Sequence, residues 1–148
     1  MELTIESILS KSPSQTQAVG ISIAKRLRLG DTVALSGEMG CGKTEIIKGI
    51  CKGLGYKQSV TSPSYIHVHQ YKGEIEILHV DFYLDGSEES IYDLGLDEYI
   101  GGNCIVLIEW ADRFPKTLPN NCWWIDIKHT YTNPEWRNIT VTPTNAVN

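Results

Sequence analysis

Eight residues between 37 and 44 have the types and spacing of a loop that binds phosphate groups. Their sequence, Gly-Glu-Met-Gly-Cys-Gly-Lys-Thr, fits the P-loop pattern G-x-x-x-x-G-K-[ST]. Glycines allow the backbone to curl so that its N–H groups point at phosphate oxygens, and the helix that follows adds the positive end of its dipole. The residues predicted to contact a nucleotide are Glu38, Met39, Gly40, Cys41, Gly42, Lys43, Thr44 and Glu45.

Two side chains at the end of this loop have separate roles in such chemistry. Lys43 is expected to neutralise the β and γ phosphates and so to take part in catalysis, and Thr44 is expected to offer its hydroxyl to Mg²⁺. We therefore predict a nucleoside triphosphate as the substrate, with ATP favoured, and Mg²⁺ as the cofactor. The sequence has no N-K-x-D segment of the kind that reads guanine, which makes a GTPase the less favoured interpretation.

Cys41 lies inside the predicted loop. A helix N-terminus is expected to lower the pKa of its thiol while the loop is empty, and bound phosphate is expected to oppose ionisation. We therefore expect alkylation of Cys41 to block nucleotide binding, and ATP to protect this residue.

A P-loop enzyme also needs acids at the ends of apolar strands, and the chain has two candidates. One apolar stretch, ILHVD, ends in Asp81, and another, CIVLIE, ends in Glu109. The run before Glu109 is uninterruptedly apolar, as in a central buried strand, so we favour Glu109 as the Mg²⁺ ligand beside Thr44. Asp81 is then the candidate that positions or activates the attacking water, and a solvated acid at a strand end is the alternative for both residues.

Three histidines lie near Asp81 on a predicted hairpin. His67 and His69 share one face of the first strand, and His79 and Asp81 share one face of the second. Zinc binding is one interpretation of this arrangement, and a solvated face of the hairpin is the other. The register of the two strands decides between them.

The first element that must support the loop is a helix before it. The sequence SPSQ at 12–15 predicts a capping box at its start. Val19, Ile23 and Leu27 repeat at four-residue spacing, as on the buried stripe of an amphipathic helix, and Gly30 is the expected terminator.

The remaining elements follow from a change of period along the chain. Residues 32–36 predict a buried strand before the loop, and an apolar face that ends at Gly55 predicts the helix after it. That face consists of Ile46, Ile47, Ile50, Cys51 and Leu54. The further predicted elements are an antiparallel hairpin within 64–84, a short acidic helix near 87–94, and strands within 104–110, 122–129 and 136–142.

Together these elements predict an α/β fold with a mixed central sheet that contains an antiparallel hairpin and is flanked by helices. We expect a single P-loop NTPase domain over residues 1–142 and a flexible tail at 143–148. The net charge of −5 opposes direct binding to nucleic acid. The four cysteines lack metal-site spacing and are expected to be reduced. The first ten residues have no basic region, and no apolar run is long enough for a membrane span, so we expect a cytoplasmic protein without a membrane partner.

Over about residues 12–142 the chain resembles the TsaE family, also called YjeE, in five motifs that occur in order: GEMGCGKT, VTSPSY, HVDFY, LGLDEYI and LIEWADR. The resemblance implies a small bacterial ATPase that works with the proteins TsaB and TsaD to make the threonylcarbamoyl-adenosine modification next to the anticodon of tRNAs that read codons beginning with A. It also implies that TsaD carries out the transfer, that ATP turnover keeps the assembly cycling, and that tRNA is met only through the complex.

The resemblance also implies roles for single residues. Lys43 and Thr44 match the family's phosphate and Mg²⁺ residues. Glu109 matches its Mg²⁺ ligand and Asp81 its essential acid, in agreement with the assignment made from the residues alone.

Two further residues and three departures from the family's pattern complete the comparison. Trp110 matches a tryptophan beside the metal ligand, with packing under the sheet as the alternative to a nucleotide contact. Arg137 falls near the place where the family contacts the nucleotide. Glu45, Ser64 and Leu84 stand where the family commonly has threonine, threonine and arginine.

The segment at 60–65 lies where P-loop switch proteins carry a segment ordered by the γ-phosphate. Its residues Thr61, Ser62 and Ser64 are candidates for sensing that phosphate. A turn that contains proline is the alternative interpretation.

Three functions are consistent with these motifs. ATP hydrolysis as a conformational switch is the leading hypothesis, and the alternatives are a small-molecule kinase and a scaffold that binds nucleotide without cleaving it. Residues 85–103 are acidic and contain no arginine, which opposes a kinase lid. Only four arginines are present and none has an evident finger position, so we expect slow turnover that rises when a partner completes the site. The acidic stretch at 87–99, with Glu88, Glu89 and Tyr92, is the candidate surface for that partner.

Overall fold

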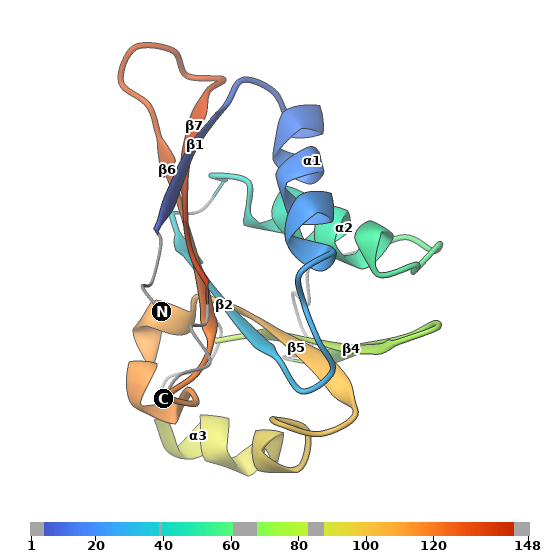
Figure 1. The fold of residues 1–148 in the computed structure, drawn as a ribbon. Helices are drawn as coiled ribbons and strands as arrows, with labels where there is room; N and C mark the ends of the chain where they lie inside the picture. The colour runs from blue at the N-terminus through green and yellow to red at the C-terminus, as the bar shows by residue number, and fades with distance from the viewer. Residues whose placement is uncertain (1–4, 39, 61–67, 83–87, 144–148) are drawn as a thin grey trace.

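The computed structural model describes residues 5–38, 40–60, 68–82 and 88–143. Figure 1 shows the arrangement of its elements, which are β1 (Glu6–Ser10), α1 (Pro13–Ala24), β2 (Thr32–Gly37), α2 (Lys43–Gly53), β3 (Val68–Lys72), β4 (Glu76–Asp81), α3 (Glu88–Asp93), η1 (Leu96–Glu98), β5 (Cys104–Glu109), η2 (Ala111–Arg113), η3 (Pro115–Thr117), β6 (Trp123–His129) and β7 (Arg137–Thr142). No helix in these described ranges is long and apolar enough to cross a membrane. The predicted tail at 143–148 lies, except for Pro143, outside the described residues.

The described strands form one seven-stranded sheet in the order β1-β7-β6-β2-β5-β4-β3. Its central strands β6, β2, β5 and β4 are parallel neighbours. The outer strands are antiparallel: β7 pairs with β6, β1 with β7, and β3 with β4. The predicted mixed sheet is therefore confirmed, and its antiparallel hairpin is β3–β4.

Helices cover one face of this sheet, where α1 and α2 lie together (Figure 1). Apolar side chains of both helices and of β2, β5 and β6 form a core on that side. A second core lies on the opposite face, where η1 and η2 contribute Leu96 and Ala111 against β4 and β5. Both faces of the central strands are buried, which explains the uninterrupted apolar run in β5.

The start of α1 is as predicted. Ser12 is the N-cap residue and its Oγ accepts a hydrogen bond from Gln15 N at 3.1 Å. The Gln15 side chain reaches back in turn, and its Oε1 accepts from Lys11 N at 2.8 Å. These reciprocal bonds satisfy backbone donors that the first helical turn leaves open.

The predicted end of this helix at Gly30 is wrong. The helix ends at Ala24, and Gly30 lies in the following connection with a φ of 94°. The backbone N–H of Gly30 donates to Cys104 O at 2.9 Å, so this glycine joins the chain to the start of β5. Leu27 still packs against the core, but it does so from the turn after the helix.

Glycines bring α1 and α2 into direct backbone contact. A Cβ atom at Gly20 would lie 2.4 Å from Ile46 O, and a Cβ atom at Gly49 would lie 2.1 Å from Gln17 O. Real side chains do not approach backbone atoms that closely, so this pairing of helices requires glycine at both positions. The pair fixes α2, whose first turn carries Lys43.

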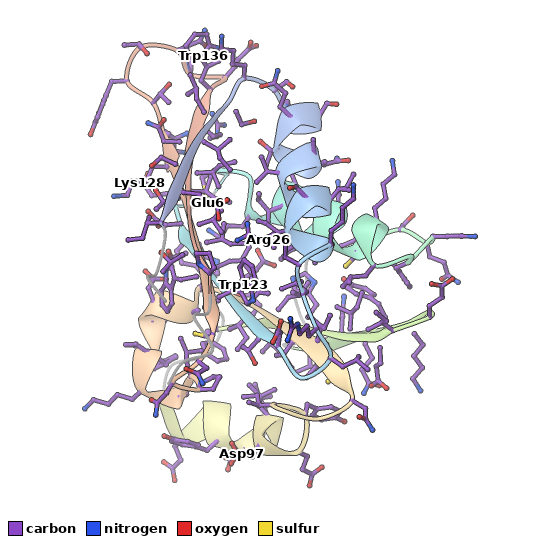
Figure 2. The ribbon with its side chains drawn as sticks, viewed as in Figure 1. Glu6, Arg26, Asp97, Trp123, Lys128 and Trp136 are labelled. Carbon is purple, nitrogen blue, oxygen red and sulfur yellow. The ribbon has the colours of Figure 1, made fainter. Side chains whose placement is uncertain are left out.

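Strand β1 was not among the predicted elements. It pairs with β7 at the edge of the sheet, and its residues alternate only weakly between apolar and polar types. Glu6 of this strand forms an ion pair of 2.9 Å with Arg26, whose guanidinium lies 4.9 Å from the centre of the Trp123 ring (Figure 2). These contacts join β1, the end of α1 and β6.

Candidate functional site

The predicted phosphate loop connects the end of β2 to the start of α2. Its last glycine, Gly42, is the N-cap residue of α2 and has a φ of 110°, which favours glycine. Glycine has no side chain to accept hydrogen bonds from the N–H groups of the first turn, so these donors can face an anionic ligand. Met39, which was also predicted to contact the nucleotide, lies outside the described residues.

Gly37 allows the loop to pass close to its neighbours. A Cβ atom there would lie 2.6 Å from Ile127 O of β6 and 2.7 Å from Cys41 Sγ. The first glycine of the motif therefore lets the loop turn directly over the end of the sheet.

Lys43 is the first residue of α2, and its buried side chain reaches back to the loop. Its ammonium donates hydrogen bonds to Gly37 O and to Glu38 O, the latter at 3.1 Å. The same group lies 3.7 Å from the centre of the Trp110 ring, a distance typical of a cation–π contact. The ammonium that is expected to meet phosphate is thus held by loop carbonyls and by an aromatic face.

Trp110 follows Glu109 directly and has a φ of 59°. It has the only positive φ among the described residues other than glycine, in a region that costs a residue with a Cβ about 1–2 kcal/mol. The side chain is half-buried. The indole lies beside the Lys43 ammonium, and part of it packs against the second core, as in the packing alternative considered from the sequence. The contact with nucleotide stays a prediction.

Cys41 differs from the expectation for a loop cysteine. Its side chain is fully buried, and this burial raises the pKa of the thiol above 9.0. The charges of Lys43 and Arg137 oppose the increase only in part. The prediction that the helix N-terminus lowers this pKa is therefore wrong, because loss of hydration of the thiolate outweighs the nearby positive charge.

Arg137 contacts the loop itself. Its Nε donates to Cys41 O at 2.9 Å, and its Nη2 lies 3.5 Å from Gly40 O. The Nη1 atom donates to Pro134 O at 2.6 Å and to Trp136 O at 2.9 Å. The guanidinium thus ties the phosphate loop to the β6–β7 hairpin, an arrangement that the sequence did not predict.

Asp81 and Glu109 lie side by side. They are register partners at the ends of the parallel strands β4 and β5, and both side chains are buried. Because β2 is parallel to β5, all three strands present their carboxyl ends at the edge where the phosphate loop begins. The two acids named from the sequence are therefore brought together at the edge of the sheet from which the phosphate loop leaves β2.

His79 is not on a solvated face. Its side chain is fully buried, its Nε2 lies 2.6 Å from Glu109 Oε2, and its Nδ1 lies 2.9 Å from Tyr71 Oη. His69 is its register partner on β3, whereas His67 lies outside the described residues. Among the residues that the structure does describe, no three His, Cys, Asp or Glu side chains gather as a metal site.

Glu45, one of the departures from the family's pattern, is involved in contacts along the helix pair. Its carboxylate forms an ion pair of 3.2 Å with Lys48 and lies 3.3 Å from Gln17 Nε2. Thr44 beside it is half-buried in the first turn of α2. The candidates for sensing the γ-phosphate and the other two departures from the family's pattern lie outside the described residues; they are Thr61, Ser62, Ser64 and Leu84.

A cavity of about 530 Å³ adjoins the start of the phosphate loop. Its lining includes Glu38, Trp110, Asp112, Asp126 and Tyr131. It therefore combines aromatic surface with carboxylate acceptors next to the loop.

The loop between β2 and α2, the parallel central strands and the paired acids at their carboxyl ends define an α/β protein of the P-loop class. Comparison with protein families narrows the class. The family model described as threonylcarbamoyl adenosine biosynthesis protein TsaE matches residues 10–139. The chain belongs to the TsaE family.

Individual relatives agree with this assignment. The chain is 36% identical over 132 residues to the tRNA threonylcarbamoyladenosine biosynthesis protein TsaE of Bacillus subtilis (strain 168), covering 88% of this chain and 81% of that protein. It is 38% identical over 130 residues to the protein of the same name from Streptomyces coelicolor, covering 84% and 87%. The crystal structure of Bacillus subtilis YdiB matches with a TM-score of 0.81 at 29% identity, over 98% of this chain and 89% of that chain.

Proposed function

We propose that this protein binds and hydrolyses ATP with Mg²⁺ in support of the threonylcarbamoyladenosine modification of tRNA, the process after which its relatives are named. The observation that carries the proposal is that the phosphate loop with Lys43 and two buried acids lie at one edge of the sheet. Phosphate-binding groups and oxygen ligands for a metal are the parts that phosphoryl transfer needs.

Phosphate binding rests on the first turn of α2. The N–H groups after Gly42 and the Lys43 ammonium supply positive charge to the same small space. Because Lys43 donates to loop carbonyls in the structure, we expect nucleotide to exchange those contacts for contacts to the β and γ phosphates.

The residues present suit Mg²⁺. A hydroxyl from Thr44 and a carboxylate from Glu109 are hard oxygen donors of the kind that this ion prefers. Mg²⁺ bound there would neutralise negative charge on the β and γ phosphates. We assign these two residues as its protein ligands, with Asp81 adjacent to Glu109 in the register.

Asp81 is the residue that we assign to the attacking water. Its carboxylate orients this water and accepts its proton while the oxygen forms a bond to the γ phosphorus and the bond to the ADP oxygen breaks. The products are ADP and inorganic phosphate. The buried position of Asp81 at the strand end supports this role.

The cavity beside the loop is where we place the nucleoside part of ATP. It begins at Gly37 and Glu38, next to the phosphate site. The carboxylates of Asp112 and Asp126 in its lining are acceptors for ribose hydroxyls or a base amino group.

We further propose TsaB and TsaD as protein partners, with tRNA reached only through their complex. The net charge of −5 is compatible with an indirect role toward tRNA. The docking surface that we propose is formed by α3 and η1, where Glu89, Tyr92, Asp93 and Asp97 are exposed. Three of the four arginines, Arg26, Arg113 and Arg137, have contacts within the chain, which supports slow turnover until a partner completes the site.

The test is phosphate release from ATP and from GTP in Mg²⁺, by the protein alone and with TsaB and TsaD added. Lys43→Ala serves as the blank, and Lys48→Ala, one turn further along α2, is the matched control. Release that favours ATP, requires Lys43 and rises with the partners supports the proposal. Nucleotide binding without release in any mixture contradicts hydrolysis and identifies a scaffold.

A further inference from the structure

Three hydrogen-bonded side chains form a chain across the sheet that includes Glu109. Tyr71 Oη lies 2.9 Å from His79 Nδ1, and His79 Nε2 lies 2.6 Å from Glu109 Oε2. The residues belong to the neighbouring strands β3, β4 and β5, and their exposed fractions are 5%, 0% and 3%. A buried polar group without a partner is costly, so this chain of contacts constrains all three side chains.

Chemistry sets the direction of these bonds. A carboxylate only accepts, so His79 Nε2 donates to Glu109. When the imidazole carries only that proton, its Nδ1 accepts and the Tyr71 hydroxyl donates to it. Asp81 is opposite Glu109 in the register, and His79 lies two residues earlier on the same face, so the imidazole reaches Glu109 diagonally from the adjacent strand.

We propose that His79 is a positioning residue for Glu109. The bond to Oε2 fixes the rotamer of the carboxylate, and thereby the place of its other oxygen, while Tyr71 fixes the imidazole. This inference rests on the proposed function, in which Glu109 is a Mg²⁺ ligand. Mg²⁺ requires near-ideal octahedral geometry, so a carboxylate already held in place binds it with less loss of conformational freedom.

A purely structural role for His79 differs from positioning in what its removal changes. Loss of a bond that only supports the sheet lowers stability and weakens nucleotide binding to the same extent with and without Mg²⁺. Loss of positioning reduces the response to Mg²⁺ and leaves nucleotide binding in EDTA nearly unchanged.

The variants are chosen to separate the bonds of the chain. His79→Leu removes both, Tyr71→Phe removes the bond to Nδ1 and leaves the bond from Nε2 to Glu109, and His79→Gln retains an N–H donor for Glu109. His69→Gln is the control for the ring contacts, because the His69 ring lies 6.1 Å from that of Tyr71 and 6.4 Å from that of His79 but takes no part in the two hydrogen bonds.

The experiment titrates Mg²⁺ against each full-length variant with an ATP analogue that carries a fluorescent label, and includes affinities in EDTA and unfolding curves without nucleotide. We expect His79→Leu to raise by about 10- to 100-fold the Mg²⁺ concentration that gives half of the maximal increase in binding of the analogue. Tyr71→Phe should raise it by about 2- to 10-fold. His79→Gln and the His69→Gln control should remain near the wild type.

Several results overturn the inference. An unchanged Mg²⁺ midpoint in folded His79→Leu does so, and so does an equal loss of affinity in Mg²⁺ and in EDTA. If His79→Leu does not fold, an unchanged midpoint in Tyr71→Phe is decisive in the same way. A wild-type affinity that does not respond to Mg²⁺ overturns the proposed Mg²⁺ role together with this inference, whereas a wild-type response that all variants share overturns the inference alone.

Discussion

Replacing Gly49 by alanine should force α1 and α2 apart and destabilise the helix pair that carries the phosphate loop. The added Cβ would lie 2.1 Å from Gln17 O and 2.9 Å from Gln17 C, which are backbone atoms and have no rotamer to change. Ordinary contact begins near 3.4 Å, so the backbones must separate by about 1.3 Å, the difference between these two distances. Overpacking of this kind costs about 1–3 kcal/mol, and the higher helix propensity of alanine offsets about 1 kcal/mol of it. Because the clash involves backbone, we expect a cost at the upper end of this range, which leaves a net loss of about 2 kcal/mol.

Urea unfolding of wild type and Gly49→Ala measures this loss. The matched control is Gly73→Ala, where the new Cβ would be 3.6 Å from Tyr56 Cδ1, an ordinary contact distance. Since α2 begins at Lys43, the displaced helix should also bind ATP more weakly than the control variant does. A Gly49→Ala protein as stable as the wild type would refute the argument that the close backbone approach sets the position of α2.

Three further predictions concern the loop and the core. Iodoacetamide should label Cys41 much more slowly in the native protein than in urea, because the thiol is buried and its pKa is raised. ATP should slow the labelling of the native protein further. Equal labelling rates with and without ATP contradict a nucleotide at this loop. Burial raises the pKa of Cys51 from 9.0 to about 12, so between these pH values the thiol loses its proton in the unfolded state but keeps it in the folded state. The free energy of unfolding should therefore fall by up to about 1.4 kcal/mol per pH unit over this range. Urea unfolding curves across the range should show a smaller slope for Cys51→Ala. Trp110→Gly should be about 1 kcal/mol more stable than Trp110→Ala in urea, since only glycine accepts a φ of 59° without strain, and equal stabilities contradict that strain.

The sequence was most informative where a local pattern of residue types is enough to specify the structure. The motif at 37–44 predicted the loop between β2 and α2, and the apolar run before Glu109 predicted a buried central strand. The two acids were named because each ends an apolar run. Their side-by-side position depends on the pairing of β4 with β5, which only the fold supplies.

Features set by packing between distant segments were not predicted. Gly20 and Gly49 have no signal in the apolar pattern, yet they determine how closely two helices approach. His79 follows the alternation of a solvated strand, but in the fold it is buried between Tyr71 of β3 and Glu109 of β5. The pKa of Cys41 was misjudged for a related reason, because the sequence shows the helix dipole and not the burial of the thiol.

Strand β1 was not predicted because it has few apolar residues and is held by contacts with segments distant in the sequence. Its partner is β7, more than a hundred residues further along the chain, and Arg26 pairs with Glu6 from the end of α1. Edge strands of this kind are specified by long-range pairing more than by local propensity.

The most direct test of the account replaces Asp81 by asparagine and measures ATP affinity and single-turnover phosphate release on the same preparation. The substitution preserves size but removes the group that we assign to the attacking water. The account predicts that ATP binds within a few-fold of the wild-type affinity while release falls by about 10²- to 10⁴-fold, the usual contribution of a positioned base. Release at the wild-type rate would contradict the assigned chemistry at this edge of the sheet.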